Sequence, residues 1–319
     1  MLTMKVVDLF SGCGGMSLGF SSQGFRIVRA YDNWEKAIET YRKNLPNHNP
    51  TLLNLLELKN DEHPEVQELK QIAPDVLIGG PPCQDFSAAG KRNGNGKNGN
   101  LTPLFAELAL KINPTWIVME NVNTIKTIGE DQLTKAKSLL KEGGYGITTV
   151  VLNAADFGVP QNRKRFFLIA RKNGKDNEMF EHLSRQKKPR ISVKDYFSKN
   201  SLKLDDLSHY YRHPRKYTRR AIFSTEEVSP TIRGVNRPIP KTYKSHEGDT
   251  QKDLAKVRPL TSKERAIIQT FPQNFNFIGN KSEVEQQIGN AVPPVLAAAI
   301  ASAIKNFEKN SILVYSSNS

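Results

Sequence analysis

The sequence predicts a doubly wound α/β domain built on a mostly parallel sheet, together with a smaller and irregular lobe. From residue 4 to about residue 171, short β-branched runs alternate with longer amphipathic segments, which is typical of repeated strand–helix units. Residues 172–257 are basic, rich in Tyr, Pro and Ser, and lack helical periodicity. Helical character returns within residues 258–319, which we expect to pack back onto the first domain at residues 1–171.

Each predicted strand is a short run of apolar and β-branched residues, and each predicted helix carries an apolar stripe. The strands are expected at residues 5–10, 26–31, 76–79, 116–120, 146–152 and 166–171. The helices are expected at residues 16–23, 34–44, 64–72, 104–112, 130–142, 261–270 and 292–307. In this fold class, ligands bind beyond the carboxyl ends of the strands, so we expect the chemistry directly after each strand.

Composition excludes several classes of protein. The chain has 319 residues, of which 38% are hydrophobic and 24% charged, so it is neither disordered, collagen-like nor a coiled coil. The longest apolar stretch, residues 295–304, is shorter than the roughly 20 residues that span a bilayer. The first residues, MLTMKVVDLF, lack the pattern of a secretory signal. We therefore expect a cytosolic protein without a transmembrane helix and with two free thiols, Cys13 and Cys83.

Positive charge is concentrated in the irregular lobe. The net charge is +14, and residues 171–260 contain 22 Lys and Arg against 11 Asp and Glu. A polyanionic partner would explain this excess, although basic surfaces also occur in proteins that bind no polyanion. The lobe is thus the predicted contact surface for such a partner.

The segment DLFSGCGGMSLGF, residues 8–20, reads as a strand, a Gly-rich turn and a helix. Its glycines allow the backbone to approach a ligand closely at a helix N-terminus. Asp32, after the next predicted strand, is suitably placed to bind a pair of ribose hydroxyls. The two features indicate a cofactor that contains adenosine; the alternative is a tight turn that needs positive φ angles. Cys13 in the turn is interpreted as a small filler.

Two further strand ends carry reactive residue types. Cys83 follows two prolines in GGPPCQDFS, where a thiolate could attack a carbon atom, whereas a lone cysteine is otherwise a small buried apolar residue. Glu120 ends the strand in VMENV and is otherwise an ordinary solvated strand end. If Glu120 lies beside Cys83, it could exchange a proton with a ring nitrogen during the attack.

Three more segments have a functional and a plain interpretation. QNRKR, residues 161–165, could clamp a phosphate or a base carbonyl, or be a solvated charge cluster. IGNAVPP, residues 288–294, could contact a ligand through its amide or simply begin a helix. Residues 90–100, rich in Gly, Asn and Lys, could be a surface loop, an active-site lid or, least in keeping with the Gly spacing, a phosphate-binding loop. The six histidines show no metal-ligand spacing, so no metal is expected.

Taken in this order, DLFSGCGG, GGPPCQDFS, ENV, QNRKR and QIGNAVPP strongly resemble the motif blocks of the cytosine-5 DNA methyltransferases of bacterial restriction-modification systems. The resemblance covers essentially the whole chain. It implies the mixed, mostly parallel, Rossmann-like sheet of S-adenosylmethionine-dependent methyltransferases, with a target-recognition domain at residues 172–257. It further implies double-stranded DNA as the substrate, a cognate restriction endonuclease as a functional partner, no membrane association and a monomeric enzyme.

The resemblance also implies a mechanism. Cys83 attacks C6 of a cytosine while Glu120 lends a proton to N3, C5 takes the methyl group of S-adenosylmethionine, and loss of the C5 proton and of Cys83 releases 5-methylcytosine. Arg165 would contact the cytosine carbonyl and Arg163 would support the site. Residues 85–103 would form a lid. Because a stacked base cannot be reached by a thiolate, the cytosine must be flipped out of the duplex.

The resemblance assigns binding residues as well. The expected cofactor contacts are Phe10, Ser11, Gly12, Gly14, Gly15, Asp32, Asn54, Pro81, Leu104, Asn290 and Val292. Asn54 departs from the family, which often has Gly-Asp-Ile where this chain has Leu-Asn-Leu, but an amide can still accept from the adenine amine. The expected DNA contacts are Gln84, Ser87, Arg233 and Arg237. The two arginines are candidates for reading guanine in the major groove, with phosphate contact as the alternative.

Three other functions are less consistent with the sequence. An RNA substrate is the nearest, since a tRNA-modifying branch shares these motifs, but its Cys-Phe-Thr signature is absent and the large insert favours DNA. A catalytically silent DNA-binding protein is disfavoured because all the reacting residues are present. A cysteine hydrolase is disfavoured because no His lies near a predicted strand end. The recognised DNA sequence does not follow from the chain, since a few loop side chains determine it.

Overall fold

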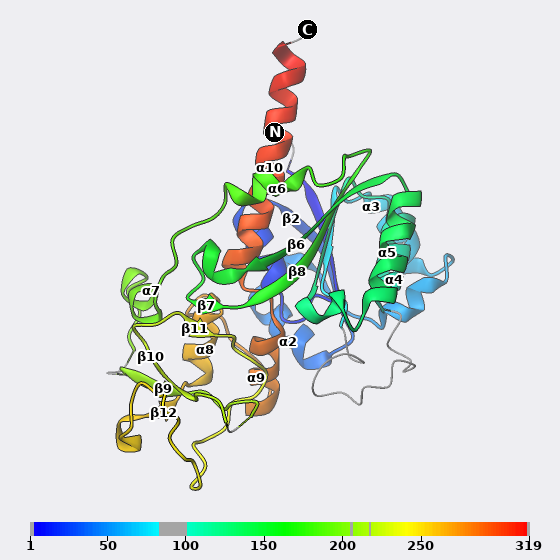
Figure 1. The fold of residues 1–319 in the computed structure, drawn as a ribbon. Coiled ribbons are helices and arrows are strands. Elements are labelled where there is room, and N and C mark those ends of the chain that lie inside the picture. The colour runs from blue at the N-terminus through cyan, green and yellow to red at the C-terminus, as the bar shows by residue number, and fades with distance from the viewer. Residues whose placement is uncertain (1–2, 83–100, 205–206, 217, 318–319) are drawn as a thin grey trace.

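The computed structural model describes residues 3–82, 101–204, 207–216 and 218–317. Its largest element is a seven-stranded sheet with the strand order β3-β2-β1-β4-β5-β8-β6 (Figure 1). Neighbouring strands are parallel except at β8, which is antiparallel to both β5 and β6. The strands are β1 (Lys5–Leu9), β2 (Arg26–Asp32), β3 (Pro50–Leu52), β4 (Val76–Gly79), β5 (Trp116–Val122), β6 (Tyr145–Asn153) and β8 (Lys164–Lys172).

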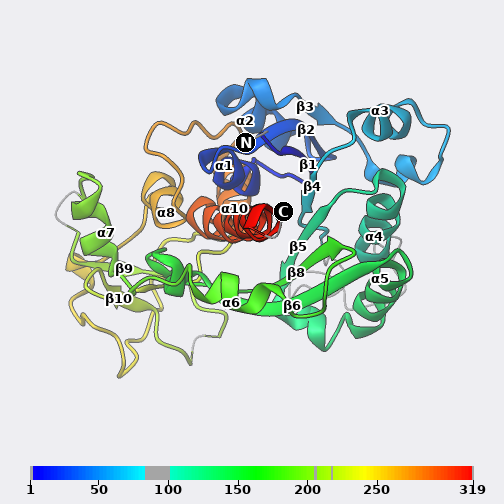
Figure 2. The same ribbon diagram turned by 90° about the horizontal axis from the view of Figure 1, so that it is seen from above.

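Helices cover both faces of this sheet, as Figure 2 shows from above. One face carries α3 (Pro64–Ile72), α4 (Leu101–Ile112) and α5 (Glu130–Glu142). The opposite face carries α1 (Gly15–Ser22), α6 (Met179–Ser184) and α10 (Pro294–Ser317), and α2 (Glu35–Asn44) packs beside β2 and β3. The predicted fold class, a doubly wound, mixed and mostly parallel sheet, is confirmed.

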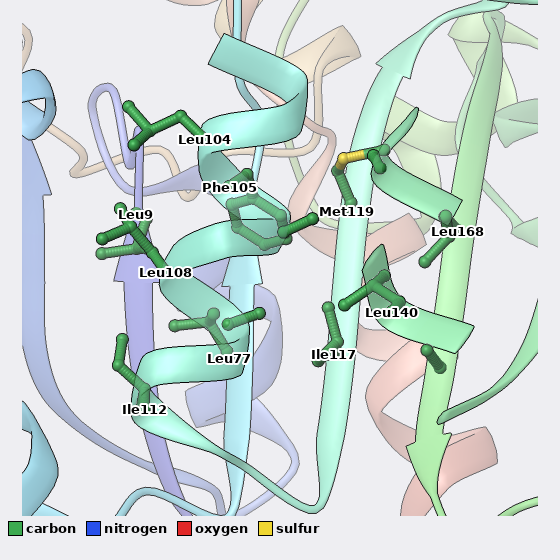
Figure 3. Packing of buried hydrophobic residues seen from close by; sticks show 14 of the residues in the cluster. Leu9, Leu77, Leu104, Phe105, Leu108, Ile112, Ile117, Met119, Leu140 and Leu168 are labelled. Carbon is green, nitrogen blue, oxygen red and sulfur yellow. The ribbon is translucent and has the colours of Figure 1, made fainter. Parts of the chain in front are cut away.

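Alternation of side chains along the strands divides the apolar residues between two cores. In β5, Ile117 and Met119 belong to the core under α4 and α5, whereas Trp116 and Val118 belong to the core under α1 and α10. Figure 3 shows the first of these cores, in which Phe105 and its neighbours on α4 point toward the sheet. Strands buried on both faces explain why the sequence shows short continuous apolar runs.

Most predicted elements in this domain are found within three residues of their expected ends. The structure contains further elements that the sequence did not predict, among them β3 and α9 (Lys281–Asn290). Strand β3 has three residues at the edge of the sheet, and α9 begins with a capping box formed by Asn280 and Glu283. Helix α10 also continues to Ser317, ten residues beyond its expected end. A three-residue strand and a largely polar helix give almost no periodic signal.

The lobe is less regular than the sheet domain but not without structure. It contains α7 (Val193–Lys199) and a three-stranded sheet with the order β10-β9-β12, and β11 (Ser229–Pro230) pairs in parallel with β7 (Gln161–Asn162). The small-sheet strands are β9 (His209–Tyr211), β10 (Ile222–Ser224) and β12 (Arg258–Pro259). The 3-10 helices among the described residues are Pro46–His48, Leu55–Lys59, Asn123–Lys126, Ala154–Phe157 and Leu254–Lys256. Although residues 172–257 lack helical periodicity in the sequence, the structure places two short helices there, α6 and α7.

Helix α6 belongs to the core of the sheet domain. Its buried Met179 and Leu183 lie in the same apolar cluster as Phe167 of β8, so this core continues past residue 171. Helix α8 (Ser262–Ile268) and α9 lie at the junction with the lobe, where Ile267 and Ile288 share an apolar cluster with residues of α7. The division at residues 171 and 257 itself stays a prediction.

The C-terminal helix α10 packs against α1 through its first turns. Among the described residues, one helical stretch, Lys281–Asn310, is long and apolar enough by composition to cross a membrane. The most apolar 18 residues of this stretch are 67% buried inside the protein, which is typical of a core helix.

Candidate active site

The carboxyl ends of four parallel strands meet at one edge of the sheet. Leu9 of β1 lies opposite Tyr31 of β2 on one side and Gly79 of β4 on the other. Gly79 in turn lies opposite Met119 of β5. The residues one position further along these strands therefore share this edge; they are Phe10, Asp32, Gly80 and Glu120.

The Gly-rich turn after β1 has the backbone conformation that its glycines permit. Gly12 and Gly14 have φ angles of 55° and 90°, and Phe10 also has a positive φ of 59°. A Cβ atom on Gly12 would meet nothing within 4 Å, so the backbone faces open space there. A Cβ atom on Gly15 would lie 2.4 Å from the carbonyl oxygen of Val292. The turn thus needs glycine both for its conformation and for the close approach of the segment before α10.

Asp32 holds this turn in place. Its Oδ2 accepts a hydrogen bond of 2.8 Å from the amide of Gly12, and its Oδ1 accepts one of 2.8 Å from the amide of Trp34. Burial raises the pKa of Asp32, and these amides oppose the rise. The buried hydroxyl of Ser11 has no hydrogen-bond partner among the described residues. Open space at Gly12, an unpartnered hydroxyl and an acid fit a ligand that carries hydroxyl and amine groups.

The other expected cofactor residues differ in exposure. Asn54 uses its side-chain oxygen to cap the 3-10 helix Leu55–Lys59, through a bond of 3.2 Å from the amide of Leu56. Leu104 is buried in the core under α4, and Val292 is 6% exposed, whereas the side chain of Asn290 is exposed. The backbone carbonyl of Pro81 accepts a bond of 3.1 Å from Asn121.

Glu120 is a buried acid paired with Arg165. Its Oε1 lies 2.9 Å from Nε of Arg165, across the antiparallel pairing of β5 with β8, and Glu120 is only 8% exposed. Burial raises the pKa of Glu120, although the charges of Arg165 and Arg163 counteract the rise. A Cβ atom on Gly80 would lie 3.4 Å from Glu120 Oε2. The acid therefore lies against the loop that leads to Cys83.

The expected nucleophile itself, with Gln84, Ser87 and residues 90–100, lies outside the described residues, and of the predicted lid only residues 101–103 are described, as the first turn of α4. The other thiol is described. Cys13 is 2% exposed, and burial raises its pKa to about 12, so it stays protonated and unreactive. The chain has two cysteines, which leaves Cys83 as the single candidate for a thiolate nucleophile.

Arg163 is fully buried and binds main-chain carbonyls from two distant segments. Its Nη1 donates to the carbonyl of Ile232 at 3.0 Å, and its Nη2 donates to that of Gly289 at 2.8 Å. Gln161 accepts from the amide of Ile232 at 2.9 Å and donates to Gln269 Oε1 at 2.5 Å. These side chains fix the lobe segment to the sheet domain, so Arg163 is a positioning residue in this structure.

A second buried group holds the same segment from the other side. Arg265 of α8 pairs with Glu285 of α9 at 2.5 Å and donates to the carbonyl of Arg233. Asn236 donates to Glu285 at 2.8 Å. Sequence reasoning missed Gln269, Arg265 and Glu285, because ionic and amide residues inside amphipathic helices read as solvated positions. We call residues 229–236 the gripped segment.

Of the two predicted base-reading arginines, Arg233 lies within the gripped segment and Arg237 directly follows it. Arg233 is half-buried and donates to the carbonyl of His213, while Arg237 is exposed. Burial and the charges of Arg215 and Arg265 lower the pKa of Arg233. Their roles stay predictions. Within the part of the chain that the structure describes, no group of three or more His, Cys, Asp or Glu residues could hold a metal ion.

The fold and this edge together define a doubly wound α/β protein that binds a ligand at the carboxyl ends of its parallel strands. The chain belongs to the C-5 cytosine-specific DNA methylase family, whose model matches residues 4–306. It is 51% identical to the type II methyltransferase M.HindV of Haemophilus influenzae, over 97% of this chain and 99% of the relative. It is 48% identical to M.HgiDI of Herpetosiphon aurantiacus, over 95% of each. The Dnmt2 methyltransferase of S. pombe has the same fold, with a TM-score of 0.68 at 17% identity over 96% of this chain and 99% of that one.

Proposed function

We propose that this protein transfers the methyl group of S-adenosylmethionine to C5 of a flipped-out cytosine in a specific duplex site, as the methyltransferase of a type II restriction-modification system. The observation that carries the proposal is the buried Glu120–Arg165 pair, which lies against the loop that brings in Cys83. Membership of the cytosine-specific family supports the choice of base.

The chain's own residues account for the steps. The thiolate of Cys83 adds to C6 of the cytosine, and Glu120, whose raised pKa favours its protonated form, gives its proton to N3. Electron density then moves to C5. Bound S-adenosylmethionine supplies the methyl group as an electrophile. A base removes the C5 proton, Glu120 takes back the N3 proton, and the Cys83 thiolate leaves C6.

Arg165 has two tasks in this scheme. Its Nε pairs with Glu120 at 2.9 Å, which holds the carboxyl group in place. Its Nη1 donates to the carbonyl of Lys164 at 2.9 Å, so Nη2 is the group that would bind the cytosine carbonyl. The base would then be held by an acid and a cation at once. Arg163 would support the site indirectly, since its own donors bind the backbone carbonyls of Ile232 and Gly289.

The cofactor would occupy the turn after β1. Ser11 and Gly12 would lie against it, Asp32 would meet the ribose, and Asn290 with Val292 would close the methionine side. Residues 172–257 would bind the DNA backbone through their excess of positive charge, and a few of their side chains would read the sequence. We further propose a monomer that acts in the cytosol and protects host DNA from a cognate endonuclease.

The test is bisulfite sequencing of DNA from cells that express the protein, with Cys83→Ala as the matched control. We expect one short sequence to carry 5-methylcytosine with the wild type and none with the variant. Duplex that contains 5-fluorocytosine has no C5 proton to lose, so it should trap a complex that survives SDS and needs Cys83. Methylated tRNA with unmodified DNA in the same cells would contradict the proposal and favour the RNA substrate.

A further inference from the structure

Four arginines lie where the lobe meets the active-site edge, and one of them is Arg165 of β8. The loop after β9 carries Arg212 and Arg215, and the gripped segment carries Arg233. The guanidinium of Arg212 donates twice to the carbonyl of Thr231, at 3.1 and 2.9 Å, and that of Arg233 donates to the carbonyl of His213. These reciprocal bonds hold the loop and the gripped segment together.

The same pair of segments is attached to the strand that leads to Arg165. Strand β11 pairs with β7, and Thr231 Oγ1 donates to the carbonyl of Asn162 at 2.6 Å. Only two residues separate Asn162 from Arg165, the partner of Glu120. The loop with Arg215 therefore lies beside the pocket into which the cytosine would enter, although it belongs to the lobe.

The charges in this region are not balanced by acids. The positive charge of Arg215 lowers the pKa of Arg165, Arg212 and Arg233 alike, so the four guanidinium groups lie within one another's field. Glu120 pairs with Arg165, but among the described residues no carboxylate pairs with the other three. Arg215 is exposed and forms no hydrogen bond or ion pair with a described residue. Like charges gathered in this way cost free energy that an anion would offset.

We propose that Arg215 binds the DNA phosphate that flanks the target cytosine, and that Arg212 and Arg233 position its loop for this contact. The inference rests on the proposed function and names a further positioning residue for it. A flipped nucleotide carries its own phosphates to the rim of the pocket, and a guanidinium can bind one phosphate through two parallel hydrogen bonds. The lobe thus contributes one side chain to the rim of the active site and helps keep the nucleotide extrahelical.

The test uses cognate duplexes in which single phosphates next to the target cytosine are replaced by neutral methylphosphonates. Wild-type protein should lose about tenfold in affinity at one such position, as expected for one charge-assisted contact. Arg215→Ala should lose about as much on unmodified DNA, show a salt slope smaller by about one, and be insensitive to that methylphosphonate. Arg215→Lys should recover part of the affinity, because it restores the charge without the paired donors.

Arg219→Ala is the matched control, since Arg219 is an exposed cation of the same loop that does not affect the pKa of Arg165. It should keep the wild-type sensitivity to the flanking methylphosphonate. If Arg215→Ala stays as sensitive as the wild type at every flanking position, the inference is wrong while the proposed function stands. If the wild-type protein forms no 5-methylcytosine at all, the proposed function fails and the inference fails with it.

Discussion

In the sheet domain, apolar side chains on both faces of β1, β4 and β5 pack under helices, and two large clusters account for its stability. In the lobe, the gripped segment is held by Gln161, Arg163 and Arg265, all buried, whose polar atoms bind its main chain. The first region is a rigid frame built by burial. The second is an irregular segment placed mainly by hydrogen bonds to its main chain, with Ile232 buried beside them. Each region should therefore respond to a different kind of substitution.

Glu120→Gln should have the largest effect, and it should leave the frame intact. An amide cannot give a proton to N3, so we expect methylation to slow by roughly 10²–10⁴-fold. The affinity for S-adenosylmethionine, measured by calorimetry, should change little, because Glu120 is not part of the turn after β1 in which we propose that the cofactor binds. A collapse of cofactor affinity together with the rate would mean that Glu120 holds the frame instead.

Arg163→Met should show that the lobe is held by polar contacts. The substitution leaves the buried carbonyls of Ile232 and Gly289 without donors, so the free energy of unfolding should fall by about 3 kcal/mol in urea titrations. Lys164→Met is the control, since Lys164 is exposed, and its change should stay within about 0.5 kcal/mol. Equal stability of Arg163→Met and wild type would remove the distinction between the two regions.

The same distinction explains what the sequence could reveal. Strand and helix periods predicted the sheet domain, because burial on defined faces imposes those periods on the chain. The motifs assigned Glu120 and Arg165 to one proposed cytosine site, and in the structure their side chains form an ion pair. No period marks residues held by long-range hydrogen bonds, so Gln269 and Arg265 went unnoticed.

Arg233→Ala and Arg237→Ala test whether the lobe reads DNA bases with these two side chains. A base reader should lose about 1–3 kcal/mol of cognate binding and accept other bases at one position. Binding to cognate and singly substituted duplexes at several salt concentrations measures both effects. Uniform losses on all duplexes would assign the two arginines to phosphates.

Asp8 of β1 is a further buried acid of the sheet domain. Asp8 accepts a hydrogen bond of 2.6 Å from Ser17, its other oxygen has no described partner, and burial raises its pKa from 3.8 to about 7. Between about pH 4 and pH 7, the folded state therefore keeps a proton on Asp8 that the unfolded state has released. Stability should therefore fall as the pH rises through this range, by up to about 1.4 kcal/mol per pH unit.

Asp8→Asn should flatten that slope, since the amide does not titrate. Urea unfolding of both proteins at pH 4, 5, 6 and 7 measures the difference. Parallel pH profiles for the two proteins would show that Asp8 is ionised in the folded state across the range.

The bonds from Gln161, Arg163 and Arg265 to this segment end on main-chain atoms, so they do not depend on the side chain at position 233. Related enzymes could therefore exchange the amino acids that read DNA, and acquire new target sites, without rebuilding the attachment of the lobe. One condition limits such exchange: a Cβ atom on Gly289 would lie 2.1 Å from the amide nitrogen of Gly234, so the helix end must keep its glycine. The DNA sequence that is recognised can therefore change through such side chains, whereas the close backbone contact between Gly289 and Gly234 must be kept.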